Sequence, residues 1–401
     1  MYRHLLGNSC RSFRRPYSTV SRPAFTSFFF HNAQWKASAR PTSSVFPTAQ
    51  ISAVAQPSFK RLASLTPIQL CKVYAQLAKS RLTFLVVLSA MASVAVHPFP
   101  TTLPVLLSTA LGTTLCSASA NTLNQIQEVP FDAQMTRTRN RPLVRRVITP
   151  VHAAGFALVT GVAGPVLLWT MVNPTTACLG IANIALYAGV YTWMKRKTIA
   201  NTWVGAVVGG IPPLMGWTAC GGHILPSSTS IHLFLPSFLT DGIASSTFDP
   251  SLIDNPLSAL ALFTLLYSWQ FPHFNSLCHI MRESYAQAGY KMIPVFSPEK
   301  NALVAFRHAA VLASLSIVIP LSGLTTWTFA ITSMVPSFLL LRTSHRFWRH
   351  TSEKEARALW QHCLWYLPAI LGLMMFHKQG VEWLDWIGVG ATPQREEHES
   401  S

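Results

Sequence analysis

Apolar stretches of about 15 to 22 residues recur between residues 82 and 376, separated by short polar connections. A helix that crosses a bilayer needs about 20 largely apolar residues, and Pro or Gly is tolerated within it where neighbouring helices satisfy the freed backbone groups. The pattern therefore predicts an all-α, polytopic membrane protein with about nine transmembrane helices. The predicted spans are 82–96, 102–120, 151–172, 176–194, 203–219, 257–272, 309–324, 326–341 and 359–376.

Basic residues precede the first predicted span and then follow every second one. The intervening connections, at 97–101, 173–175, 220–256 and the turn near Gly323, contain no Lys or Arg. By the positive-inside rule, the N-terminus and all basic connections lie on one side of the membrane. An odd number of spans places the C-terminal tail on the other side.

Composition supports a membrane protein and argues against nucleic-acid binding. Half of the 401 residues are hydrophobic, 11% are charged, and the formal net charge is +17. The cations fall between apolar blocks instead of forming a stripe with aromatic residues, so no nucleic-acid partner is expected. The seven cysteines include no Cys-x-x-Cys pair, which argues against a disulfide framework or a zinc site.

The chain divides into three parts by composition. Residues 1–64 lack Asp and Glu and are rich in Arg and Ser, which is typical of a mitochondrial transit peptide; the alternative is a disordered basic tail. Residues 65–378 form the predicted membrane domain, and 379–401 form an acidic C-terminal tail. If the transit interpretation holds, the protein is a multi-pass protein of the mitochondrial inner membrane, with its N-terminus and basic loops facing the matrix.

The first acidic residue of the chain is Glu128, within the pattern Asn124-x-x-x-Glu128-x-x-x-Asp132. Helical residues four apart share a face, so Asn124 and Glu128 can point at one ion, and Asp132 joins them if the turn through Pro130 keeps the phase. Pro130 is expected to end or bend the helix and to leave the carboxylate beside water at the mouth of the bundle.

Five arginines follow at once, from Arg137 to Arg146 and including Arg141. Arg binds phosphate oxygens bidentately, and Mg²⁺ is held by a few carboxylates together with substrate phosphates. The combination predicts a site for a metal-bound diphosphate. Two alternatives stay open: the acids only balance the arginines in a solvated loop, or the arginines only set the topology.

A second polar group follows the sixth predicted span and contains Trp269, His273, Arg282, Glu283, Tyr285 and Lys291. Glu283 is a candidate ligand for a second cation, with Arg282 and Lys291 on phosphate. Three interpretations stay open for His273: an axial haem ligand, a base, or an interfacial residue whose hydrogen bonds are satisfied.

A third group runs from Tyr191 through Lys195 and Arg196 to Asn201. The Gly209-Gly210 and Pro212-Pro213 pairs that follow predict a broken, closely packed helix beside a cavity.

Together these groups resemble the UbiA-type intramembrane prenyltransferases, and within them the protoheme IX farnesyltransferases, or haem O synthases. The resemblance covers residues 66–378 and is most specific in EVPFDAQMTRTRNRPL from Glu128, ANTWVGA from Ala200, PPLMGW from Pro212 and WQFPHFN from Trp269. It implies a bundle of nine helices around a central cavity that opens at the matrix face and laterally to lipid.

The resemblance also implies roles for individual residues. Asn124, Glu128 and Asp132, with Glu283, would bind Mg²⁺ and the diphosphate of farnesyl diphosphate, and Arg137, Arg141, Lys195 and Arg196 would steady the leaving group. The expected substrate-binding residues are Tyr191, Asn201, Trp269, His273, Arg282, Tyr285 and Lys291. This chain departs from the family pattern twice: Glu128 replaces the usual Asp, and Ser284 stands where many relatives carry an acid.

The implied reaction is transfer of the farnesyl group to a vinyl group of haem B with addition of water, which gives haem O and diphosphate, a step towards haem A for cytochrome c oxidase. Metal and Arg stabilise the leaving diphosphate, while a dry aromatic cavity, with Trp193, Trp217, Trp269 or Tyr191 as candidate faces, shields the allylic cation. Two alternatives are another aromatic or chlorin acceptor and, from a different class, a membrane carrier or assembly protein. A second copy of the chain and the next enzyme of haem A synthesis stay open as partners.

Overall fold

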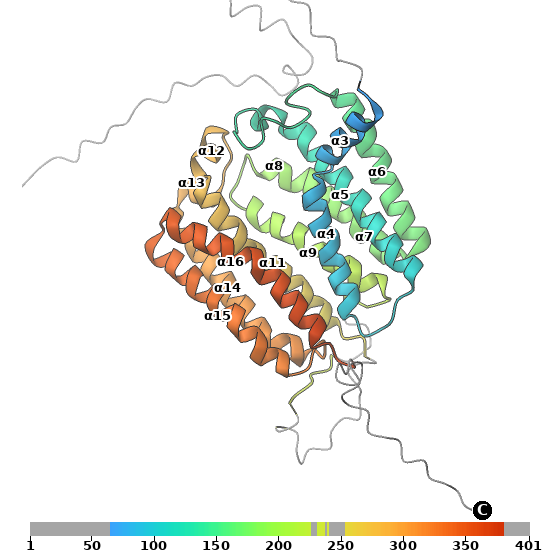
Figure 1. Ribbon diagram of the computed structural model, residues 1–401, viewed down its shortest axis with the longest axis vertical. Coiled ribbons are helices and arrows are strands. Elements are labelled where there is room, and N and C mark those ends of the chain that lie inside the picture. The colour runs from blue at the N-terminus through green and yellow to red at the C-terminus, as the bar shows by residue number, and fades with distance from the viewer. Residues whose placement is uncertain (1–64, 226–230, 237–238, 240–252, 381–401) are drawn as a thin grey trace, which may run out of the picture. The chain divides into compact units, whose positions relative to one another are not determined.

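The computed structural model describes residues 65–225, 231–236, 239 and 253–380, and every named element within these ranges is a helix (Figure 1). In the same ranges, the one isolated β-bridge joins Thr325 and Lys378. The all-α prediction is therefore confirmed. The predicted transit segment, part of the 220–256 connection and nearly all of the acidic tail lie outside the described residues.

A long helix overlaps each of the nine predicted spans, usually beyond the predicted ends. These helices are α4 (Ser80–Val96), α5 (Leu103–Asp132), α6 (Pro150–Met171), α7 (Pro174–Ile184) continued by the π-helix η1 (Ala185–Tyr191) and α8 (Thr192–Met194), α9 (Asn201–Ala219), α11 (Pro256–Ile280), α14 (Pro298–Leu321), α15 (Thr328–His350) and α16 (Glu353–Phe376). Three short helices complete the described part: α3 (Pro67–Leu77), α12 (Arg282–Gln287) and α13 (Ile293–Phe296).

Five of these segments are long and apolar enough to cross a membrane: α5, α6, α7 through α8, α14 and α16. The pair α3 and α4, bent by 58°, makes a sixth if it is counted as one span. The chain is thus an all-helical, multi-pass membrane protein. Spans at α9, α11 and α15 stay predictions.

Polar caps and prolines set where the helices begin. Thr66 and Gln69 form a capping box at the start of α3, in which each side chain bonds the other residue's backbone N–H. Proline in the first turn costs little because the backbone N–H there has no partner within the helix. Pro occupies the first or second position of α3, α5, α6, α7, α11, α13 and α14.

Three prolines that were expected to interrupt helices do not. Helix α5 continues through Pro130 to Asp132, and α9 is unbroken across Pro212 and Pro213. Helix α9 is buried from Gly210 to Ala219, so its neighbours hold it in place despite the missing backbone bonds. The close packing was predicted correctly: a Cβ on Gly216 would lie 2.0 Å from the Ala90 carbonyl oxygen of α4.

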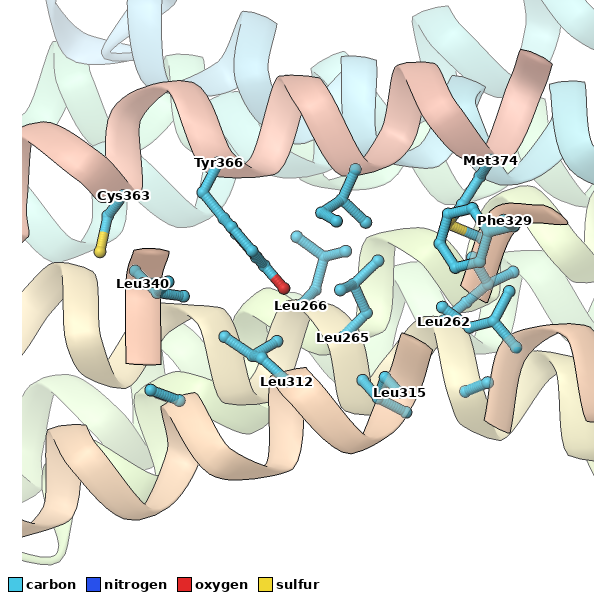
Figure 2. Packing of buried hydrophobic residues seen from close by; sticks show 14 of the residues in the cluster. Leu262, Leu265, Leu266, Leu312, Leu315, Phe329, Leu340, Cys363, Tyr366 and Met374 are labelled. Atoms are coloured by element: carbon cyan, nitrogen blue, oxygen red, sulfur yellow. The ribbon is translucent and has the colours of Figure 1, made fainter. Parts of the chain in front are cut away.

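The helices pack in two neighbouring groups. Helix α5 packs on α4 and α6, and α9 packs on both α4 and α11, which connects the first group to α14, α15 and α16. The second group encloses an apolar core in which Leu265 and Leu266 of α11 lie close to Leu312 of α14 and Tyr366 of α16 (Figure 2). Burial of each such side chain contributes about 1.5–3 kcal/mol. Helices α12 and α13 lie at the same end of the bundle as α3 (Figure 1).

Candidate active site

The last two turns of α5 place three oxygen-bearing side chains on one face. Because the helix runs through Pro130 without losing phase, Asn124, Glu128 and Asp132 follow one another at intervals of four residues. Only 0%, 4% and 2% of their surfaces are exposed. The expectation that the carboxylates sit beside water at the mouth of the bundle is therefore wrong; helix α5 carries them into the protein.

Each of these three side chains is bonded to a cation of the protein. Lys195 Nζ lies 2.8 Å from Glu128 Oε1, and Lys79 Nζ lies 2.8 Å from Asn124 Oδ1. Arg141 pairs with Asp132 and approaches Glu128 Oε2 at 3.9 Å. Buried charges need this kind of pairing, because an isolated carboxylate out of water is strongly unfavourable.

The segment after α5 folds back to bring Arg141 over the helix end. Thr138 Oγ1 donates to the Asp132 carbonyl at 3.0 Å, and Arg139 N donates to the Met135 carbonyl at 2.9 Å. This compact turn directs Arg141 towards the carboxylates, and Arg137 lines the same cavity. Arg139, Arg145 and Arg146 are exposed and lie outside the cavity lining.

These groups border a cavity of about 220 Å³. Four of its lining side chains are cationic and two are anionic, so its polar part carries an excess of positive charge. The lining residues are Lys79, Leu82, Glu128, Asp132, Met135, Arg137, Thr138, Arg141, Tyr187, Tyr191, Lys195, Phe274, Tyr285, Tyr290 and Met292. Such a surface suits an anion of several charges next to an apolar group.

Four tyrosines form the aromatic part of the wall. Tyr187 and Tyr191 stack at 5.4 Å along η1, and Lys195 Nζ lies 4.6 Å from the Tyr191 ring centre. A π-helical turn often marks a functional site, and here it brings both rings to the cavity. The other two, Tyr285 and Tyr290, come from the segment after α11 and meet edge to face at 6.0 Å.

Burial shapes the chemistry of the groups outside the spans. Burial raises the pKa of Tyr285 to about 12, and burial together with the Glu128 and Asp132 carboxylates raises the pKa of Tyr290. Both hydroxyls are therefore neutral near pH 7 and do not act as bases. Burial alone would lower the pKa of Lys195, but the Glu128 carboxylate outweighs it and holds that pKa above its ordinary value, so Lys195 is charged.

Asn201 holds the segment after α11 against the end of α8. Its Nδ2 donates to the Thr198 carbonyl at 2.7 Å and to the Lys291 carbonyl at 2.9 Å, while Lys291 N donates to the Lys195 carbonyl at 2.8 Å. The side chain of Asn201 and the backbone of Lys291 therefore support the cavity wall. Neither residue is part of the lining.

Other predicted site residues lie elsewhere. Asn124 and Arg196 are outside the lining, and the Arg196 guanidinium lies 5.1 Å from the Phe131 ring centre. On α12, Arg282 is half-buried and Glu283 is exposed. Glu283 is not in the lining, so a second metal ligand at this position has no support from the geometry.

On α11, Phe274 lines the cavity, but the predicted residues Trp269 and His273 do not. Trp269 Nε1 donates to the Cys363 carbonyl of α16 at 3.0 Å, and the Trp269 ring stacks on His273 at 4.7 Å. Trp217 is fully buried against His97, and Trp193 is half-exposed under Lys197. Of the four proposed aromatic faces, Tyr191 alone lines the cavity.

Three important lining residues were missed from the sequence: Lys79, Tyr187 and Tyr290. Lys79 is one of the basic residues before the first predicted span, which indicate topology alone, and nothing in the sequence marks the break between α3 and α4 at which it lies. Tyr187 could have been found from its four-residue spacing to Tyr191, although a π-helical turn cannot be read from that spacing.

The donor set fits a hard divalent cation. Within the described residues, no group of three or more His, Cys, Asp and Glu side chains could hold a metal. Two carboxylates and an amide oxygen instead match Mg²⁺, which binds proteins through one or two carboxylates and takes its other ligands from phosphate and water. Each of these oxygens already attracts a cation of the protein in the structure.

The chain matches a known protein family over most of its described length. The pattern of the UbiA prenyltransferase family matches residues 83–367, which include every lining residue except Lys79 and Leu82. This chain belongs to the UbiA prenyltransferase family.

Relatives of this UbiA family member include a mitochondrial protoheme IX farnesyltransferase of Gibberella zeae, 43% identical over 326 residues that cover 78% of this chain and 62% of that protein. The protein of the same name in Neurospora crassa is 40% identical over 373 residues, which cover 89% of this chain and 68% of the relative. The chain thus spans between 62% and 68% of the length of these two curated relatives.

Solved structures share the UbiA fold at low identity. A digeranylgeranylglyceryl phosphate synthase aligns with a TM-score of 0.60 at 13% identity, covering 77% of this chain and 98% of that one. A UbiA homologue from Archaeoglobus fulgidus bound to GPP and Mg²⁺ aligns with a TM-score of 0.52 at 12% identity, covering 75% and 99%. At these identities the likeness establishes the fold alone.

Proposed function

We propose that this chain is a Mg²⁺-dependent protoheme IX farnesyltransferase of the mitochondrial inner membrane. It would transfer the farnesyl group of farnesyl diphosphate to a vinyl group of haem B and add water, giving haem O and diphosphate. One observation carries the proposal: buried Glu128 and Asp132 meet four cations and four tyrosines at a single cavity, in a chain about 40% identical to proteins of that name.

The residues divide the reaction between them. Asn124, Glu128 and Asp132 would hold Mg²⁺, which when bound neutralises charge on the diphosphate. Arg137, Arg141 and Lys195 bind phosphate oxygens and stabilise the leaving group, in a position fixed before the reaction begins. That the solved Archaeoglobus homologue carries GPP and Mg²⁺ supports this assignment.

The bond changes balance without a redox partner. The allylic C–O bond breaks and its electron pair leaves with diphosphate; the π electrons of the vinyl group then form the new C–C bond. The oxygen of a water molecule adds to the cation left beside the porphyrin, and one proton is released. The rings of Tyr187, Tyr191 and Tyr290 face the allylic cation and keep other water away.

The haem contacts are proposed for α11. Trp269 and His273 lie one turn apart on this helix, and His273 is next to the cavity-lining Phe274. We therefore assign them to haem and not to diphosphate. The same proposal includes four further points: cleavage of the transit segment, the matrix orientation of the cavity, self-association, and contact with the next enzyme of haem A synthesis.

The test uses the full chain in nanodiscs with farnesyl diphosphate, haem B and Mg²⁺, followed by extraction of the haems and mass analysis. Haem O should form with the intact chain and not with Asp132→Ala or without Mg²⁺. A folded preparation that binds haem but yields no farnesylated haem would refute the acceptor. Prenylation of another aromatic ring, or ligand transport without turnover, would then identify the alternative.

A further inference from the structure

Lys79 differs from Lys195 and Arg141 of the cavity because its hydrogen-bond partners are neutral side chains. Lys195 and Arg141 each pair with a carboxylate, whereas Lys79 Nζ contacts Asn124 Oδ1 at 2.8 Å and the Tyr187 hydroxyl at 3.2 Å. Among the described residues, no carboxylate lies within ion-pair distance of Lys79. An ammonium withdrawn from water without a counterion favours a nearby anion.

The backbone of Lys79 is held in an unusual conformation. It lies at the 58° break between α3 and α4 with φ 50° and ψ 57°, the left-handed region that most residues avoid. A conformation of this kind persists only where its surroundings enforce it, and such sites are often functional.

Helix α5 enforces this conformation directly. Gln125 Nε2 donates to the Gln76 and Leu77 carbonyls at 3.0 and 2.8 Å, and Asn121 Nδ2 donates to the Ala78 carbonyl at 3.1 Å. The three carbonyls next to the break are thus bound by α5, the helix that also carries Asn124. Lys79 is held in a fixed position above the proposed metal ligands.

We propose, on the basis of the function proposed above, that Lys79 couples metal binding to diphosphate binding. Without ligand its amine is bonded to Asn124 Oδ1; when Mg²⁺ and diphosphate enter together, the amine moves to a phosphate oxygen and releases the amide oxygen to the metal. Mg²⁺ alone is opposed by the charge of Lys79, and diphosphate alone is opposed by Glu128 and Asp132. Each ligand therefore strengthens the binding of the other, by the same factor.

The experiment is calorimetry on the full chain in detergent, with Mg²⁺ alone, inorganic pyrophosphate alone, and each in the presence of the other, corrected for their association in solution. In the intact chain, each ligand should strengthen the other's binding at least about tenfold. Equal binding with and without the second ligand would overturn the proposal, whatever the variants do.

The variant Lys79→Met keeps the length of the side chain and removes its charge. Its binding of Mg²⁺ alone should strengthen about tenfold and its binding of pyrophosphate alone should weaken about tenfold, while Lys79→Arg keeps the affinities of the intact chain. If Lys79 had only a structural role, the substitution would strengthen both affinities, weaken both or change neither. Each of these results would overturn the proposal.

Arg81→Met is the matched control, because Arg81 is an exposed cation two residues away that does not line the cavity. It should leave both affinities unchanged. Changes equal to those of Lys79→Met would mean that the loss of any nearby positive charge has this effect, and they would overturn the proposal. The acceptor assignment is tested separately. If haem O forms but coupling is absent, the coupling proposal fails alone; if coupling is present but no haem O forms, the acceptor fails alone.

Discussion

The segment after α5 and the segment after α11 meet at one cavity and supply opposite chemistry. With the end of α5, the first brings Asp132, Arg137 and Arg141 into the lining. The second brings Tyr285, Tyr290 and Met292, while Glu283 and Lys291 are exposed. Both segments carry charged residues in the sequence, but only the first brings charged side chains to the cavity, and the aromatic residues come from the second.

This difference separates the two requirements of prenyl transfer. A diphosphate that leaves with several negative charges needs fixed cations, whereas an allylic carbocation needs a wall that offers π electrons and little water. The cavity meets the first need mainly from α5 and the second from η1 and the segment after α11. The comparison predicts that charge substitutions in the two segments have very different consequences.

The largest expected difference is between Asp132→Ala and Glu283→Ala. Loss of the buried carboxylate should lower kcat about 100- to 1000-fold, because it removes a group that acts on the leaving diphosphate. Loss of the exposed Glu283 should change kcat less than about threefold, as is usual for surface positions. Haem O formation in nanodiscs measures both; equal losses would mean that the second segment also supplies a metal ligand.

The next test compares two lysines whose backbones are bonded to each other, Lys195 and Lys291. Lys195→Met leaves the buried Glu128 without its 2.8 Å partner and should destabilise the protein by about 3 kcal/mol. Lys291→Met removes an exposed charge and should change stability by less than about 0.5 kcal/mol. Thermal unfolding in detergent compares the two, and similar midpoints would show that the buried Glu128 does not depend on its pairing with Lys195.

A smaller effect is expected at the aromatic wall. Tyr290→Leu should raise the ratio of farnesol to haem O about tenfold, because a lost cation–π contact admits water to the allylic cation. Tyr290→Phe keeps the ring and should keep the ratio. Product analysis by mass separates the outcomes; a ratio that follows the hydroxyl and not the ring would assign Tyr290 a polar role.

The fold was largely predictable from the sequence because apolar runs and caps are local signals. A helix overlaps every predicted span. The errors came where neighbours override local preference: α5 passes Pro130, and α9 passes Pro212 and Pro213. A proline's cost can be estimated from the sequence, but the packing that offsets it cannot.

The site was predictable where spacing within one helix decides it, as for Glu128 and Asp132. It was not predictable where distant segments meet. Lys79 reaches the cavity through a left-handed break held by α5, and Tyr290 reaches it through a segment tied to Asn201. For Glu283 and Lys291 the sequence showed suitable residue types but could not show that their side chains face solvent.

The smallest effect is expected at Asn201, which joins the segment after α11 to the turn before α9 without lining the cavity. Asn201→Ala loses the bond to the Lys291 carbonyl, a contribution of about 1 kcal/mol, and should lower kcat/KM roughly fivefold. Amide hydrogen exchange should rise over residues 285–292, since the tyrosine wall is held less firmly.

Asn301→Ala is the matched control, because Asn301 is an equally buried asparagine that bonds the Asn275 carbonyl in another part of the bundle. It should weaken the fold by a similar amount and leave exchange at 285–292 unchanged. Equal exchange in the two variants would mean that Asn201 only stabilises the bundle, and the aromatic segment would then hold its position by its own packing.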